Sequence, residues 1–260
     1  MLRLLFSGMT DPGLLRSSNQ DDYYIDPDGR FFIVADGMGG HAGGKEASHI
    51  ATNTIQTYLA EHWDSPLTTQ EILRKALLLA NRAIVDDQKQ NPERADMGTT
   101  AVVLTFRKRD GQPWCAHVGD SRLYQLRGPK IAQLTEDHTW IARAVRDGEL
   151  TVDQSRTHPW RHVLSQCLGR EDMNRIDIQP IKAQAGDRFL LCSDGLTEEL
   201  PDSLIAAHLK SIRASESAVK ALIHSAKQRG GRDNITVIIV TLLPEKDTPE
   251  SDVPTDFVVP

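Results

Sequence analysis

The chain has 260 residues, of which 39% are hydrophobic and 25% charged, which is typical of one globular domain with a sizeable core. Its net charge of -6 argues against nucleic acid or an anionic membrane as the main partner. The 3 cysteines include no C-x-x-C pair, so they indicate neither a disulfide framework nor a zinc site and fit a reduced, cytoplasmic compartment. The opening MLRLLF is too short for a signal peptide, and no apolar run predicts a transmembrane helix.

The N-terminal part of the chain predicts three strands. Apolar runs at Leu2–Phe6, Tyr23–Ile25 and Arg30–Ala35 have the length and composition of strands. The segment Asp26-Pro27-Asp28-Gly29 separates the last two runs and is a strong turn signal. We therefore expect a hairpin there, after a loop at Gly8–Arg16.

Two long helices are predicted next. Apolar residues recur at helical spacing from Lys45 to about Glu61. A second helix is predicted to start near Thr68, because Thr68 and Glu71 stand at the spacing of a capping box.

The middle of the chain changes character. Short strand-like runs joined by turns predict an antiparallel meander rather than β-α-β crossovers. These runs are Thr100–Phe106, Trp114–Val118, Arg122–Leu126 and Ile131–Leu134. A short helix is predicted over Thr139–Asp147, followed by a mobile surface element over Glu149–Gln166.

The C-terminal third predicts two core strands, Phe189–Cys192 and Ile235–Val240. Two helices are expected between them, at about Leu200–Lys210 and Ser215–Arg229. Residues 244–260 are rich in proline and acidic side chains and predict a disordered tail. Residues 1–243 then form a single domain.

The stretch Phe31–Lys45 carries the strongest functional signal. The apolar run Phe31–Ala35 predicts a buried strand that leads directly into Asp36 and a glycine-rich loop containing His41. A carboxylate at the mouth of a buried strand needs a partner to stay ionised, and a metal ion is a usual one. Glycine lets the backbone approach an ion closely because it has no Cβ. A plain strand, turn and flexible loop is the alternative interpretation.

The same arrangement recurs at other strand ends. Asp194 and Asp120 each follow an apolar run, Asp233 precedes a third run, and Asp21 leads into a fourth. Each aspartate taken singly is typical of a turn or a helix cap. Carboxylates that converge on one rim of a sheet instead predict a site for a hard cation such as Mg2+ or Mn2+.

Two nucleotide-binding motifs compete for the glycine loop. Gly39-x4-Gly44-Lys45 is close to a P-loop, but Glu46 stands where a Ser or Thr should hold Mg2+. Residues 37–42 also match the G-x-G-x-x-A pattern of dinucleotide folds. Hairpins rather than β-α-β units are expected downstream, which argues against both, and a P-loop-like nucleotide-binding protein stays as an alternative.

Short motifs follow one another along the chain in a characteristic order. They are Arg16-Ser17-Ser18-Asn19-Gln20-Asp21, Asp36-Gly37-Met38-Gly39-Gly40-His41-Ala42-Gly43, Met97-Gly98-Thr99-Thr100, Val118-Gly119-Asp120-Ser121-Arg122, Ser193-Asp194-Gly195-Leu196 and Arg232-Asp233-Asn234-Ile235-Thr236. Together they span residues 16 to 236. In this order they resemble the bacterial form of the PP2C-type (PPM family) metal-dependent protein serine/threonine phosphatases.

The resemblance implies an α+β fold, an α-β-β-α sandwich of two antiparallel sheets flanked by helices, with metals at one end between the sheets. It also implies hydrolysis of phosphoserine or phosphothreonine in proteins by a water that bridges two Mg2+ or Mn2+ ions. The implied metal ligands are Asp36 as the bridge, the Gly37 carbonyl, Asp194 and Asp233, Gln20 and Asp21 through water, and Asp120 at a third, weaker ion.

Further residues are implied to meet the substrate. Arg16 would grip the phosphate with its guanidinium fork, and His41 would protonate the leaving seryl or threonyl oxygen. Residues 136–170 resemble the flap of the family, from which His162 and Arg170 would contact the phosphoprotein. A surface salt bridge for Arg16 and solvated loop positions for the flap residues are the alternatives.

The implied partners are phosphoproteins and a cognate serine/threonine kinase, and we expect a monomeric, cytoplasmic enzyme. A catalytically inactive relative that only binds phosphoproteins is the remaining alternative. The complete set Asp36, His41, Asp194 and Asp233 argues against it.

Overall fold

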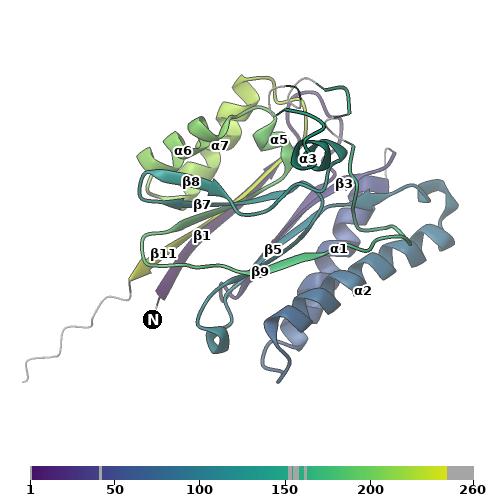
Figure 1. Cartoon of the computed structure of the whole chain (residues 1–260), viewed down its shortest axis with the longest axis horizontal. Helices are drawn as coiled ribbons and strands as arrows, with labels where there is room; N and C mark the ends of the chain where they lie inside the picture. The colour runs from purple at the N-terminus through teal and green to yellow at the C-terminus, as the bar shows by residue number, and fades with distance from the viewer. Residues whose placement is uncertain (1, 41–42, 152–153, 155–157, 161–162, 245–260) are drawn as a thin grey trace, which may run out of the picture.

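The computed structural model describes residues 2–40, 43–151, 154, 158–160 and 163–244. Two antiparallel sheets pack face to face, and helices cover the outer face of each sheet (Figure 1). This arrangement confirms the expected α-β-β-α sandwich. None of the described helices combines the length and the apolar composition needed to cross a membrane.

The first sheet joins the two ends of the chain. Its strand order is β1-β11-β10-β7-β8. Its strands are β1 Leu2–Asp11, β7 Arg122–Arg127, β8 Lys130–Gln133, β10 Arg188–Cys192 and β11 Ile235–Pro244. β1 pairs with β11 over its whole length, from Leu2 opposite Pro244 to Asp11 opposite Ile235. The loop expected to start at Gly8 is therefore strand up to Asp11, because β11 offers a hydrogen-bonding partner to each added residue.

The second sheet has the order β2-β3-β5-β6-β9, with β4 also paired to β3. Its strands are β2 Asp21–Ile25, β3 Phe31–Met38, β4 Gly98–Thr99, β5 Ala101–Thr105, β6 Trp114–Val118 and β9 Asp177–Pro180. The predicted hairpin between β2 and β3 is confirmed. Gly29 in its turn has a φ of 68° and donates its N–H to the Asp26 carbonyl at 2.8 Å.

The predicted four-strand meander is wrong, because β6 and β7 belong to different sheets. β6 pairs with β5 and β9, whereas β7 pairs with β8 and β10. The chain crosses between the sheets through Gly119, Asp120 and Ser121. Gly119 has a φ of 100°, and Ser121 Oγ lies 2.7 Å from Oγ1 of Thr100, which stands between β4 and β5 of the second sheet. Asp120 therefore lies between the sheets and not at the tip of a hairpin.

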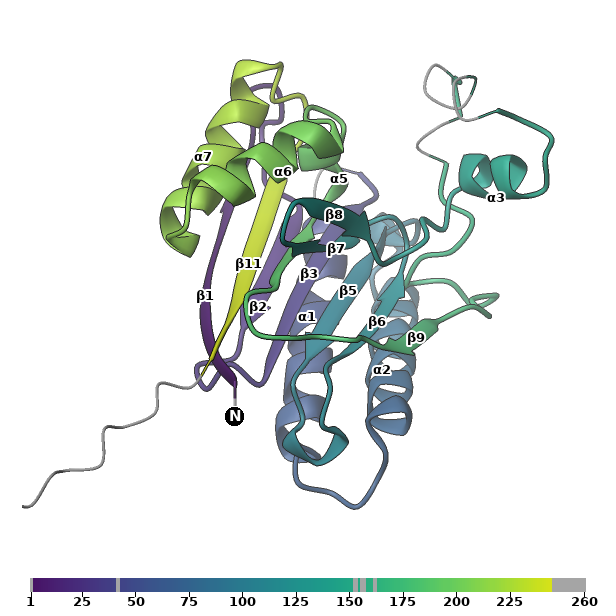
Figure 2. The same cartoon turned by 60° about the vertical axis from the view of Figure 1, so that its left-hand side comes forward.

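Helices form the outer layers. α1 Gly43–Glu61 and α2 Thr69–Gln90 cover the second sheet, and α6 Asp202–Ser211 and α7 Ser215–Gln228 cover the first (Figure 1). Shorter helical elements with described bounds are η1 Pro92–Arg94, η2 Lys108–Asp110, α3 Trp140–Arg146 and α5 Asp194–Thr197. α3 projects away from the sandwich (Figure 2). Thr68 and Glu71 form the predicted capping box of α2. Strand β9 and helix α5 were not predicted from the sequence.

Apolar layers fill both sides of each sheet. In β3, Phe32 and Val34 pack between the two sheets, whereas Phe31 and Ile33 pack with residues of α1 and α2. The residues of β11 are divided between the inner and outer layers in the same way. Because both faces of the strand are buried, β3 is a continuous apolar run instead of an alternating one.

Some predictions concern residues outside the described part of the chain. His41, His162 and residues 245–260 are among them, so the predicted tail and the roles of these histidines have no structural counterpart here. Pro244, which was assigned to the tail, is the last residue of β11.

Candidate metal centre

One cavity of about 730 Å³ gathers aspartates that the sequence places at strand ends. Its walls come from both sheets: Asp36 lies in β3, Asp120 between β6 and β7, Asp194 at the start of α5, and Asp233 just before β11. Four segments that are distant in sequence thus place carboxylates around one space.

Asp36 is held by the neighbouring strands. Its backbone N–H donates to Thr100 Oγ1 at 3.0 Å, and its carbonyl accepts from the Thr100 N–H at 2.9 Å and from Thr99 Oγ1 at 2.8 Å. Burial, followed by the Asp21 and Asp194 carboxylates, raises the pKa of Asp36 well above its ordinary value. The backbone therefore fixes a carboxylate whose ionised form needs a nearby cation.

Glycines beside the aspartates are required by close backbone contacts. A Cβ at Gly37 would lie 2.0 Å from the Gly44 carbonyl oxygen, and a Cβ at Gly195 would lie 2.0 Å from the Asn234 carbonyl oxygen. A side chain fits at neither position unless the backbone moves. These contacts hold the segments that carry the cavity aspartates close together.

Asp194 and Asp233 come from two segments that meet at the cavity. Asn234 fixes the segment of Asp233, because its Nδ2 donates to the Pro12 and Ser18 carbonyls, both at 3.0 Å. Burial and the Asp233 carboxylate raise the pKa of Asp194. The two carboxylates repel each other when both are ionised. Two carboxylate ligands of one cation repel each other in the same way until the cation binds.

Asp21 is buried and does not itself line the cavity. It pairs with Asp36 across β2 and β3. Its Oδ2 accepts from Ser193 Oγ at 2.7 Å and from Thr236 Oγ1 at 2.6 Å, while the buried Oδ1 has no hydrogen-bond partner among the described residues. Burial raises the pKa of Asp21 to about 7. A buried carboxylate oxygen without a donor fits a site for a hydrated cation.

Arg16 and Gln20 reach the cavity from the segment between β1 and β2. Arg16 Nη2 donates to Asp233 Oδ2 at 2.6 Å, while 52% of the Arg16 side chain is exposed. Gln20 Nε2 donates to the Gly40 carbonyl at 2.8 Å. Arg16 is thus a cavity residue with a solvent-accessible guanidinium, and Gln20 anchors the glycine loop that leads to His41.

Arg170 does not line the cavity. Its Nη2 pairs with Asp172 Oδ2 at 2.8 Å, and its backbone N–H donates to Asn81 Oδ1 of α2 at 3.1 Å. The substrate-binding roles of Arg170 and His162 and the acid role of His41 stay predictions.

Some cavity residues had no separate signal in the sequence. Glu198, Arg232 and Leu164 line the cavity. Arg232 belongs to the quoted motif of Asp233 but was given no role of its own. Its Nε donates to Glu199 Oε1 at 2.8 Å. Leu164 lies in the segment after α3, and the course of this segment places it at the cavity. No local sequence pattern predicts that course.

The donor set fits hard divalent cations. The described lining has five acidic side chains against two arginines, and it contains no cysteine and no histidine. Carboxylate and carbonyl oxygens are the ligands that Mg2+ and Mn2+ prefer. A cation in this cavity would relieve the repulsion among the carboxylates.

A model of the family described as protein phosphatase 2C matches residues 16–236. The chain therefore belongs to the protein phosphatase 2C family. The P-loop and dinucleotide interpretations of the glycine loop are wrong, because β3 pairs with β2, β4 and β5, all antiparallel, in the described structure. A β-α-β unit needs a parallel neighbour.

Comparison with individual proteins supports the same family assignment. The chain is similar to the serine/threonine phosphatase stp of Listeria welshimeri, with 37% identity over 240 residues that cover 89% of this chain and 93% of stp. It is 34% identical over 246 residues to the serine/threonine protein phosphatase PstP of Mycobacterium tuberculosis. That match covers 93% of this chain but 46% of PstP, so the chain spans about half the length of that relative.

A solved structure of the catalytic domain of PstP in complex with two manganese ions is also similar. The match has a TM-score of 0.80 and 32% identity, and it covers 94% of this chain and 100% of that one. The likeness extends over nearly the whole sandwich.

Proposed function

We propose that the protein hydrolyses phosphoserine and phosphothreonine in proteins and requires Mg2+ or Mn2+. The observation that carries this proposal is the convergence of four aspartates from separate segments on one cavity that also contains Arg16. Family membership supports the same reaction. A cognate kinase, a monomeric state and a cytoplasmic location stay predictions from the resemblance.

The cavity residues have distinct proposed roles toward two cations. When bound, the cations supply Lewis acidity toward the phosphate and lower the pKa of the attacking water. Asp36 suits the bridging position because its backbone is fixed by Thr99 and Thr100. The remaining proposed ligands are the Gly37 carbonyl, Asp194 and Asp233, with Asp21 and Gln20 acting through water.

Arg16 is proposed to bind the phosphate and His41 to protonate the leaving oxygen. The planar guanidinium of Arg16 matches two phosphate oxygens, and its exposure leaves it accessible to a substrate. A proton donor matters most for a poor leaving group, so His41→Ala should slow phosphopeptide hydrolysis more than p-nitrophenyl phosphate hydrolysis. Equal losses on both substrates would remove His41 from this role.

Asp120 is proposed to bind a third, exchangeable ion. It lines the same cavity, and it lies where the chain crosses between the sheets and not in a hairpin turn. Asp120→Asn should therefore keep a folded protein with two tightly bound ions and lose most of its turnover. Asp194→Asn should instead lower the number of tightly bound ions, which calorimetric titration with Mn2+ counts.

The decisive experiment is phosphopeptide turnover by the purified chain with Mn2+ and after exhaustive chelation. Phosphate release should require the metal, and Asp36→Asn should abolish it at every Mn2+ concentration. Full activity after chelation would contradict the metal mechanism. Tight phosphopeptide binding without phosphate release would instead identify an inactive binding protein.

A further inference from the structure

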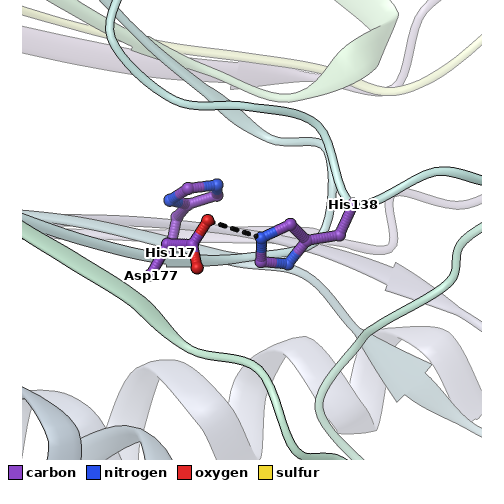
Figure 3. A group of neighbouring side chains, drawn as sticks. All are labelled: His117, His138 and Asp177. Atoms are coloured by element: carbon purple, nitrogen blue, oxygen red, sulfur yellow. Dashed lines mark hydrogen bonds and ion pairs between the residues drawn. The ribbon is translucent and has the colours of Figure 1, made fainter. Parts of the chain in front are cut away.

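A second group of histidine and acid side chains lies near the crossing between the sheets. His117 on β6, His138 after β8 and Asp177 on β9 each offer a ligand atom, and these atoms lie within 4.8 Å of one another (Figure 3). By residue type, two buried imidazoles and a carboxylate resemble a transition-metal site. The hydrogen bonds of the group decide whether it is one.

The protonation of His138 argues against metal binding. The Gly119 backbone N–H donates to His138 Nδ1 at 3.2 Å, and a backbone N–H can only donate. The neutral ring therefore carries its proton on Nε2, which donates to Asp177 Oδ2 at 3.2 Å (Figure 3). Both ring nitrogens of His138 are in use, so neither has a free lone pair for a metal.

Asp177 already has a positively charged partner. Arg175 donates through Nε to Oδ1 at 3.0 Å and through Nη2 to Oδ2 at 2.6 Å. Two members of the group, Asp177 and His138, therefore belong to a chain of hydrogen bonds. This chain runs from Arg175 through Asp177 and His138 to the backbone of Gly119. Such a chain fixes the orientation of the imidazole ring.

His138 holds Gly119 at two points. Besides the bond to the ring, the His138 backbone N–H donates to the Gly119 carbonyl at 3.0 Å. Gly119 also packs closely against Thr100, because a Cβ at Gly119 would lie 2.6 Å from Thr100 Cγ2. The next residue is Asp120, whose carboxylate lines the cavity. The buried His138 ring thus supports the turn that carries a proposed metal ligand.

We propose that His138 is a positioning residue for the phosphatase reaction. Oriented by Asp177 and Arg175, it holds the Gly119 backbone and so sets where the Asp120 carboxylate stands. The inference rests on the proposed role of Asp120 at an exchangeable ion. Removing a group that orients a metal ligand typically changes metal affinity or activity by about 10-fold to 100-fold.

The test is the Mn2+ dependence of phosphopeptide turnover by two variants of the full chain. His138→Leu loses the acceptor for Gly119, whereas His138→Asn keeps an oxygen near the position of Nδ1. His138→Leu should need about 10-fold more Mn2+ or more for half-maximal turnover, with two tightly bound ions retained. His138→Asn should recover most of this shift. A lowered melting temperature with wild-type Mn2+ dependence would overturn the inference.

His117→Gln is the matched control. His117 Nε2 donates to the Glu136 carbonyl at 2.9 Å, a bond that glutamine can reproduce, and no described hydrogen bond joins His117 to Gly119. Its Mn2+ dependence should equal that of the wild type. If the leucine variant fails to fold, Asp177→Ala serves in its place, because it frees the His138 ring and should shift the Mn2+ dependence in the same direction. An unshifted curve would overturn the inference.

The double variant Asp120→Asn/His138→Leu separates the two proposals. If His138 acts through Asp120, the double variant should lose no more turnover than Asp120→Asn alone, whereas additive losses would overturn the inference. Normal turnover by Asp120→Asn would instead refute the third-ion role itself. One tightly bound Zn2+ in the wild type that disappears in His138→Leu would make the group a metal site and would also overturn the inference.

Discussion

The buried carboxylates that the structure describes include two contrasting groups. In the first group each carboxylate forms an ion pair with an arginine. Asp26 pairs with Arg30 at 2.6 Å, and Asp187 pairs with Arg127 at 2.7 Å. Burial alone would raise their pKa, but the arginine hydrogen bonds outweigh it, and the pKa of both carboxyl groups is lowered. These carboxylates are ionised and neutralised within the fold.

The cavity carboxylates have the opposite environment. Burial and neighbouring aspartates raise the pKa of Asp36, Asp120 and Asp194. Of the cavity aspartates, Asp233 has a direct bond to an arginine, Arg16. A carboxylate with its own guanidinium stabilises the fold, whereas a cluster without one needs a cation from solution. Variants in the two groups should therefore respond differently to metal.

Asp36→Asn should have the largest effect. We expect turnover of a phosphopeptide to fall at least about 1,000-fold, equivalent to about 4 kcal/mol of transition-state stabilisation. In chelator, the same variant should have a higher melting temperature than the wild type, because it removes a charge that its neighbours repel. A lower melting temperature in chelator would contradict the comparison, and Asp26→Asn, with normal kcat, is the control.

Arg16→Ala tests the cavity arginine that pairs with Asp233. Hydrogen bonds to charged groups contribute about 1.5–3 kcal/mol, so KM for a phosphopeptide should rise about 10-fold to 100-fold. The kcat should fall less, because the guanidinium binds phosphate in the ground state and the transition state alike. Steady-state kinetics decide this, and Arg16→Lys should recover part of the loss. A normal KM with a reduced kcat would exclude binding of the ground-state phosphate by Arg16.

Asp26→Ala tests an arginine-paired carboxylate. Asp26 accepts from Arg30 Nε at 2.9 Å and from the Asp28 N–H at 3.0 Å, and it is fully buried. We expect the free energy of unfolding to fall by about 2 kcal/mol, with unchanged Mn2+ dependence. Denaturant titration measures the first quantity and turnover the second. A changed Mn2+ dependence would contradict the distinction between arginine-paired carboxylates and cavity carboxylates.

Asp177→Asn should have the smallest effect, a loss of stability that is present at neutral pH and disappears in acid. Burial would raise the pKa of Asp177, but hydrogen bonds from Arg175 and His138 lower it from 3.8 to about 2. A lowered folded-state pKa adds stability that is present above the unfolded value and is lost as the pH falls through the folded value. The stability difference between wild type and variant should therefore shrink between about pH 4 and about pH 2. Thermal unfolding in chelator measures it, and a constant difference would refute the pairing.

Local features were readable from the sequence by itself. β6 was predicted with the bounds Trp114–Val118 that the structure has, and the capping box of Thr68 and Glu71 is present. The hairpin at Asp26–Gly29 and the buried run from Phe31 were also predicted. Such features depend on neighbours in the chain: turn residues set backbone angles, and apolar runs mark buried strands. The ordered motifs further implied the sandwich.

Tertiary structure alone decided where these pieces meet. The crossing at Asp120 replaced the expected meander, and neither Asp21 nor Arg170 lines the cavity. The chain of bonds from Arg175 to Gly119 joins three segments that no motif connects. Partner choice between distant segments depends on how the sheets and helices pack, and short-range patterns do not encode it. The same packing determines which buried carboxylates receive an arginine and which need a metal ion.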